Sequence, residues 1–158
     1  MLSFIIAVFV LVGIDQITKY LAIEHLMNTR GIPIIKDVFE LVYVENRGAA
    51  FGIMQNRVMF FVIITFAILG FIIYYYNKIP KEKKYNYIRF CLILIVSGAI
   101  GNLIDRIFLG YVVDFIYFKL IDFPVFNIAD IYVTVGAILT FILIIFVYKN
   151  DEFFNKYL

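Results

Sequence analysis

Reactive and metal-binding side chains are scarce in this sequence. It has one cysteine, Cys91, one histidine, His25, and two serines, Ser3 and Ser97. A single cysteine excludes an intrachain disulfide and a cysteine metal cluster, and a lone histidine argues against a zinc site. Neither serine lies in a nucleophile-elbow sequence, which argues against a serine hydrolase. We therefore expect a protein that uses no metal and no cofactor.

Charged residues are also few. Only 16% of the 158 residues are charged and 64% are hydrophobic, whereas a soluble domain is about a quarter charged and about half apolar. A soluble protein of this length could not bury so much apolar surface, so lipid is the natural solvent. The net charge of +2 argues against a nucleic-acid partner, and outside one short loop no basic patch is interleaved with aromatic residues.

Four long apolar stretches predict four membrane-spanning helices in a single integral-membrane domain covering residues 1–158. The second and fourth stretches carry no charged residue, while the first and third carry several polar ones. We expect the spans at about residues 2–23, 58–76, 87–109 and 131–148.

The distribution of lysine sets the expected orientation, because positively charged loops stay in the cytoplasm. Residues 77–86 hold Lys78, Lys81, Lys83 and Lys84 against the single acidic Glu82. This connection is therefore expected to be cytoplasmic, together with both termini and the tail 149–158. Residues 24–57 and 110–130 then face outward.

The first outer connection also contains a strand signal. Residues 38–44, VFELVYV, are β-branched, aromatic and partly alternating, and the turn-forming residues 45–48 follow. We expect an all-α membrane protein with four transmembrane helices and a small extracytoplasmic β-sheet between the first and second spans.

Several polar residues in or beside the spans have obvious local partners. Asp15 and Lys19 are four residues apart on one predicted helix, which suits an ion pair. Asn102, Asp105 and Arg106 share one face of the third predicted span. Charges in a bilayer are costly and are retained where they pair or function. The simplest interpretation is that these groups satisfy one another and hold helices together.

Asp114 and Asp130 have no basic residue within a helical turn. One solution is that the two carboxylates face each other, share one proton and titrate at separate pH values. That arrangement is the one an aspartic protease uses to activate water. A competing interpretation is that Asp130 only caps the fourth helix, where an acidic residue is favoured.

Four sequence blocks, in order along the chain, resemble the lipoprotein signal peptidases (signal peptidase II). They are DQITK at 15–19, NRGAAFG at 46–52, GAIGNLIDR at 98–106 followed by GYVVDF at 110–115, and FPVFNIAD at 123–130. The sequence departs from the family pattern at two flanking positions, with Ile131 where a serine is usual and Tyr117 where a second aspartate is frequent.

This resemblance implies an intramembrane aspartic protease of the bacterial cytoplasmic membrane, with its active site near the outer face. Asp114 and Asp130 resemble the catalytic pair. The resemblance and the polar clusters together assign a supporting or substrate-binding role to Asp15, Lys19, Asn46, Gly48, Asn102, Asp105, Arg106 and Asn127. An outer β-cradle and an amphipathic outer segment are also implied, and the small residues Gly48, Ala49, Ala50 and Gly101 would let a peptide backbone approach.

The implied substrate is a prolipoprotein whose cysteine carries diacylglycerol, cleaved just before that cysteine. The other implied partners are membrane lipid and globomycin-type inhibitors, and we expect a monomer. Two alternatives belong to other classes: a small proton- or ion-coupled transport protein with intramembrane carboxylates, and a non-catalytic scaffold in which both aspartates only cap and pair.

Overall fold

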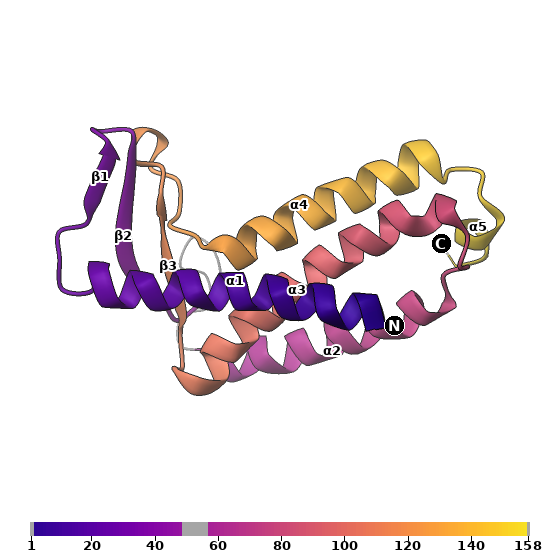
Figure 1. Ribbon diagram of the computed structural model, residues 1–158, viewed down its shortest axis with the longest axis horizontal. Helices are drawn as coiled ribbons and strands as arrows, with labels where there is room; N and C mark the ends of the chain where they lie inside the picture. The colour runs from indigo at the N-terminus through magenta and orange to yellow at the C-terminus, as the bar shows by residue number, and fades with distance from the viewer. Residues whose placement is uncertain (1, 49–56, 158) are drawn as a thin grey trace.

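The structure is a computed structural model that describes residues 2–48 and 57–157. In this part of the chain, four helices are long and apolar enough to cross a membrane. They are α1 (Leu2–Leu26), α2 (Val58–Lys78), α3 (Asn86–Phe108) with the short turn η2 (Lys83–Tyr85) before it, and α4 (Ile128–Ile142) continued by the π-helical turn η4 (Leu143–Val147). Figure 1 shows these helices as one elongated bundle with a small sheet at one end and the short helix α5 (Glu152–Tyr157) at the other.

Helix α3 is the centre of the bundle. Half of its most apolar stretch is buried, against 6% for the corresponding stretches of α2 and α4. Glycines let neighbouring helices approach it closely. A Cβ atom on Gly98 would collide with the backbone carbonyl of Ala129 in α4, and one on Gly101 would collide with the Asp15 carboxylate of α1. The groups on α3 are therefore held at short range from both α1 and α4.

The sheet has three antiparallel strands in the order β1-β2-β3, namely β1 (Ile32–Ile35), β2 (Phe39–Asn46) and β3 (Val112–Tyr117). Its third strand comes from the connection between α3 and α4, which was not expected to contribute a strand. Asp114 of β3 pairs with Val44 of β2, after an irregularity in the strand register. The sheet therefore joins the connection between α1 and α2 to the connection between α3 and α4, and Asp114 lies within its third strand.

Apolar side chains pack the sheet against the end of α1. Ala22 and Leu26 of α1 form one buried cluster with Val113 and Phe115 of β3. The residue alternation of β3 turns these two side chains to the opposite face from Asp114. The Asp114 side chain therefore points away from α1, on the opposite face of the sheet.

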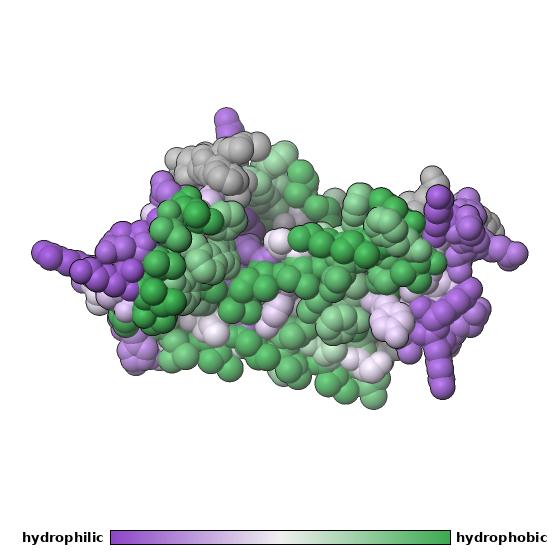
Figure 2. Space-filling model, turned by 90° about the horizontal axis from the view of Figure 1, so that it is seen from above, coloured by the Kyte–Doolittle hydropathy of each residue, from purple (hydrophilic) through white to green (hydrophobic). Residues whose placement is uncertain are grey.

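The outer surface of the bundle is apolar. Figure 2 shows hydrophobic side chains over its middle and hydrophilic ones at its two ends. Phe9, Met59, Phe66 and Phe141 are each more than half exposed. Such continuous apolar exposure is incompatible with water and is satisfied by lipid. The fold class expected from the sequence, a four-helix membrane protein with a small sheet, is confirmed.

The helices differ from the expected spans mainly at their ends. Helix α1 extends past the expected residue 23 to Leu26, and α4 begins at Ile128 rather than at residue 131, because Asn127 caps it. Residues 49–52 of the second motif, including Ala49 and Ala50, lie outside the described residues. The amphipathic outer segment and the inside and outside assignments remain predictions.

Candidate active site

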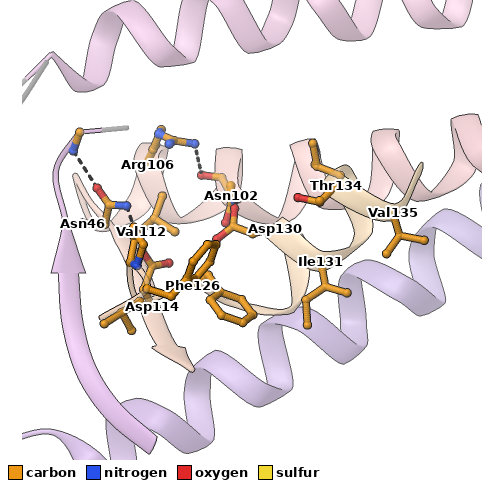
Figure 3. A pocket seen from close by; sticks show the side chains of 15 residues that line it. Asn46, Asn102, Arg106, Val112, Asp114, Phe126, Asp130, Ile131, Thr134 and Val135 are labelled. Carbon is orange, nitrogen blue, oxygen red and sulfur yellow. Dashed lines mark hydrogen bonds between the residues drawn. The ribbon is translucent and has the colours of Figure 1, made fainter. Parts of the chain in front are cut away.

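A pocket of about 430 Å³ lies where the sheet meets the end of α3 and the start of α4. Figure 3 shows it with side chains from each of these elements. Its polar lining consists of Asn46, Gly48, Asn102, Arg106, Asp114, Asp130 and Thr134. Its apolar lining consists of Val112, Phe123, Pro124, Val125, Phe126, Ile131, Val133 and Val135. Both candidate aspartates therefore reach one cavity from different parts of the chain.

Asp114 is a strand residue whose side chain is nearly inaccessible, with 2% exposure. One carboxylate oxygen accepts a hydrogen bond from the Asn46 side-chain amide at 2.9 Å, and the other accepts from the Asn127 amide at 2.7 Å. Burial, followed by the negative charge of Asp130, raises the pKa of Asp114 to about 7. A carboxyl group in this setting is poised to hold a proton at neutral pH.

Asp130 lies in the first turn of α4. Its backbone N–H donates to the Asn127 side chain at 2.9 Å, and its carboxylate accepts from the Asn127 N–H at 3.2 Å, which forms a capping box. The same carboxylate accepts from the Asn102 amide at 2.7 Å and lines the pocket. The Asp130 carboxylate can therefore take part in capping α4 and still line the pocket. The N-cap residue itself is Asn127, not Asp130.

Two asparagine side chains connect the aspartates. The Asn127 amide donates to Asp114 and also, at 3.0 Å, to the side-chain oxygen of Asn102. Asn102 in turn donates to Asp130. Asn127 is fully buried, so its hydrogen bonds to Asp114 and Asn102 are shielded from solvent. The chain of hydrogen bonds fixes the two carboxylates relative to each other.

Behind this pair lies a buried charged cluster from α1 and α3. The Lys19 ammonium lies 2.9 Å from the Asp15 carboxylate, 3.0 Å from that of Asp105 and 2.9 Å from the Asn102 oxygen. The expected i,i+4 ion pair between Asp15 and Lys19 is present. However, Lys19 also reaches across to α3, a contact that sequence spacing does not reveal.

Gln16 is a polar member of this cluster that was missing from the candidate residues. Its amide donates to Asp15 at 3.2 Å, to Asp105 at 3.0 Å and to the Gly101 carbonyl at 3.2 Å. The available signal was an uncharged amide inside a long apolar stretch, next to an aspartate. Such a group needs a partner in a bilayer.

The remaining candidates flank the pocket. The Gly48 N–H donates to the Asn46 side chain at 3.0 Å, which orients the Asn46 amide toward Asp114. The Arg106 guanidinium donates to the backbone carbonyl of Asn102 at 3.4 Å and lies 5.2 Å from the centre of the Phe61 ring. Asn46, Gly48, Asn102 and Arg106 therefore line the pocket, while Asp15, Lys19, Asp105 and Asn127 lie behind its wall.

Comparison with known proteins adds an independent line of information. A family model described as signal peptidase (SPase) II matches residues 6–146. A lipoprotein signal peptidase of Caldanaerobacter subterraneus subsp. tengcongensis is 52% identical over 92% of this chain and 97% of its own length. The chain belongs to the signal peptidase II family.

Other relatives agree with this membership. A lipoprotein signal peptidase of Clostridioides difficile is 45% identical, over 90% of this chain and 95% of the relative. A bacterial membrane enzyme solved by the in meso method at 2.3 Å resolution superposes with a TM-score of 0.79 at 34% identity, covering 96% of this chain and 92% of that one. Signal peptidase II is a protease, so the chain is a multi-pass bacterial membrane protease, and the transporter alternative has no support.

Proposed function

We propose that this signal peptidase II is an aspartic protease whose catalytic pair is Asp114 and Asp130, and that it cleaves prolipoproteins just before a diacylglyceryl-modified cysteine. The observation that carries the proposal is the meeting of two carboxylates, from β3 and from the first turn of α4, in one pocket. The supporting asparagines hold both carboxylates at fixed positions. The names of the relatives supply the substrate class.

The environments of the two aspartates assign their roles. Asp114 carries the shared proton, because burial and the charge of Asp130 raise its pKa to about 7. Asp130 is the ionised partner, at a helix N-terminus that favours negative charge. Two carboxyl groups in such different settings can divide the acid and base functions of one reaction.

The proposed reaction proceeds in two steps. Asp130 takes a proton from a water molecule, whose oxygen attacks the scissile carbonyl carbon, while Asp114 gives its proton to the carbonyl oxygen. The resulting tetrahedral intermediate then collapses: protonated Asp130 delivers its proton to the leaving nitrogen, the C–N bond breaks, and Asp114 recovers a proton from a hydroxyl of the intermediate. The products are a carboxylic acid on the signal peptide and a free amine on the cysteine, and the enzyme returns to its starting state.

The pocket suits a substrate that arrives within the membrane. Part of its lining, Phe123, Ile131 and Val135, is 37–45% exposed on the apolar outer surface. A signal helix that diffuses in the bilayer can therefore reach the pocket from the side. Since the lysine-rich connection 77–86 is expected to be cytoplasmic, the pocket lies near the outer face, where the end of a signal helix and its lipid-modified cysteine are found.

The remaining partners follow from the same site. We propose membrane lipid around the apolar surface, globomycin-type peptides as inhibitors that occupy the pocket, and a monomer as the working unit, since the pocket contains both proposed catalytic residues from one chain. Both termini are proposed to be cytoplasmic, which follows from the lysine distribution with four spans.

The proposal is tested with Asp114→Asn and Asp130→Asn, purified in detergent and assayed on a diacylglyceryl-modified prolipoprotein. Each variant is expected to lose roughly 10³-fold or more in kcat while still binding a globomycin-type peptide. Asp122→Asn is the matched control, because Asp122 lies outside the pocket and has a positive φ of 47°, a conformation that asparagine tolerates.

Full activity in either variant at the proposed pair would overturn the assignment of that aspartate. Loss of activity in Asp122→Asn as well would indicate a general defect in the assay or the fold. If the wild type failed to cleave this substrate under conditions in which a related signal peptidase succeeds, the proposed substrate class would be wrong.

A further inference from the structure

Two buried carboxylates lie directly behind the proposed catalytic pair. Asp105 accepts a hydrogen bond at 3.1 Å from the backbone N–H of Val113, the residue before Asp114. Asp15 accepts one at 2.9 Å from the N–H of Ala129, the residue before Asp130. Each proposed catalytic aspartate is therefore held through the backbone of its neighbour by a carboxylate on a transmembrane helix.

One ammonium group joins these two carboxylates. Lys19 lies 2.9 Å from Asp15 and 3.0 Å from Asp105, and it donates its remaining hydrogen bond to the Asn102 oxygen at 2.9 Å. Its three N–H groups thus have three acceptors. The third contact also turns the Asn102 amide nitrogen toward Asp130, to which it donates at 2.7 Å.

We propose that Lys19 is a positioning residue that sets the separation of the two catalytic carboxylates by drawing Asp15 and Asp105 together. This inference rests on the proposed aspartic mechanism. Lys19 is absent from the residues that line the pocket in the described part of the chain. It therefore acts through Asp15, Asp105 and Asn102 rather than by touching substrate.

Burial strengthens the electrostatic interactions within this cluster. The side chains of Lys19, Asp15 and Asp105 are 3%, 0% and 4% exposed, so water does not screen their interactions. Without the ammonium, two like charges would face each other in a low-dielectric interior and would separate or take up a proton. Either response shifts Val113 relative to Ala129, and with them the two catalytic side chains.

The surrounding packing transmits such a shift. Gly101 lies against Asp15 so closely that a Cβ atom there would collide with the carboxylate.

The titratable groups that face Lys19 are Asp15 on its own helix and Asp105 on α3, and Asp130 and Asp114 lie beyond Asn102. The Lys19 charge also lowers the pKa of Asp114, against the larger opposing effects of burial and Asp130.

The experiment compares Lys19→Met with Lys84→Met in the purified full-length enzyme. Lys84 is a matched control, because it also forms a 2.8 Å ion pair, with Asp151, but at the opposite end of the bundle. For Lys19→Met we expect kcat per folded molecule to fall about 10²-fold with KM changed less than about threefold, as displacement of reacting groups by about 1 Å predicts. The basic limb of its pH–rate profile is expected to move to higher pH. Lys84→Met is expected to stay within about twofold of the wild type.

A second variant keeps the test decisive if Lys19→Met does not fold. Lys19→Arg retains the charge, but a planar guanidinium cannot place three donors as an ammonium does. We expect it to fold and to lose about tenfold in kcat. Wild-type kcat and an unshifted pH profile per folded molecule, in either variant, would overturn the positioning role. Failure of the wild type to cleave, or full activity of Asp114→Asn, would instead contradict the proposed function.

Discussion

The two ends of the bundle use the same kind of ion pair in different surroundings. At the sheet end, Lys19 is 3% exposed and has carboxylates on both sides. At the other end, Lys84 pairs with Asp151 at 2.8 Å, but its side chain is 52% exposed. Buried charge that loses a partner is costly, whereas an exposed pair contributes little. Because burial differs between the two pairs, we expect the loss of a partner to cost more at Lys19 than at Lys84.

At the end of the bundle opposite the sheet, called the far end below, aromatic side chains pack the elements together. Tyr85 and Tyr148 are buried in an apolar cluster with Ile79 and Ile88. The Tyr148 hydroxyl donates to the Lys84 carbonyl at 2.6 Å, and the Tyr85 hydroxyl donates to Asp151 at 2.7 Å. This region ties the end of the fourth span to the connection before α3. It contributes to stability without reaching the pocket.

Asn127→Ala is expected to give the largest loss of activity, because Asn127 is hydrogen-bonded to both Asp114 and Asp130 and caps α4. The change removes hydrogen bonds to Asp114 and Asn102 and the cap on the Asp130 N–H. We expect kcat to fall by roughly 10³-fold and stability to fall by about 1–2 kcal/mol from the lost cap. Measurement of kcat together with thermal unfolding in detergent checks both. An active Asn127→Ala variant would contradict the shared hydrogen-bond chain.

Gly101→Ala is expected to come next. The new methyl group would collide with the Asp15 carboxylate and would lie 3.3 Å from the Ala129 side chain. We expect about a 10²-fold loss of kcat, because the displaced carboxylate releases the Ala129 N–H. Gly13→Ala on α1 is the control, since nothing lies within 4 Å of a Cβ atom there. Equal activity of the two variants would show that Asp15 does not position α4.

The pH dependence of the wild type provides a third test. Asp114 must be protonated to donate to the carbonyl, and its pKa in the folded enzyme is raised to about 7 by burial and by Asp130. We expect kcat/KM to fall about tenfold per pH unit above about pH 7, as Asp114 loses its proton. A profile that is flat from pH 6 to pH 9 would be inconsistent with a proton on Asp114.

The same raised pKa makes a prediction about stability. The folded state holds a proton on Asp114 up to about pH 7, whereas the ordinary carboxyl pKa is 3.8. The stability that this proton confers is complete below about pH 4 and is lost as the pH rises through about 7. We expect Asp114→Asn to remove this dependence, so that its melting temperature relative to the wild type rises between pH 5 and pH 8. Parallel curves for the two proteins would contradict it.

The smallest effect is expected for Asp151→Asn at the far end. The change weakens the partly exposed pair with Lys84 and keeps a hydrogen-bond acceptor for Tyr85. We expect stability to fall by no more than about 1 kcal/mol and kcat to be unchanged. A large loss of activity would show that the two ends of the bundle are coupled.

The sequence was sufficient to predict the four helices, because an apolar stretch long enough to cross a bilayer has few other structures available. It also predicted the Asp15–Lys19 pair, which lies within one helix. The resemblance to the family brought Asp114 and Asp130 together as a proposed pair. The structure places both in one pocket, although their catalytic roles remain proposals.

Contacts between elements could not be predicted in the same way. The spacing of Lys19 and Asp105 does not reveal how α1 and α3 are rotated about their axes, so their 3.0 Å contact was missed. The run from Val112 to Tyr117 is β-branched and aromatic, but its partner strand β2 lies in the connection between α1 and α2. Pairing over such a separation is determined by tertiary packing rather than by local preference.

The pairing of β2 with β3 also has a consequence for biogenesis. Strand β2 is synthesised well before β3, and Asp130 follows only at the start of the last span. A nascent chain released before α4 lacks one proposed catalytic residue and both asparagine contacts to it. On the proposed assignment, the catalytic pair is therefore complete only once the chain has been synthesised as far as Asp130.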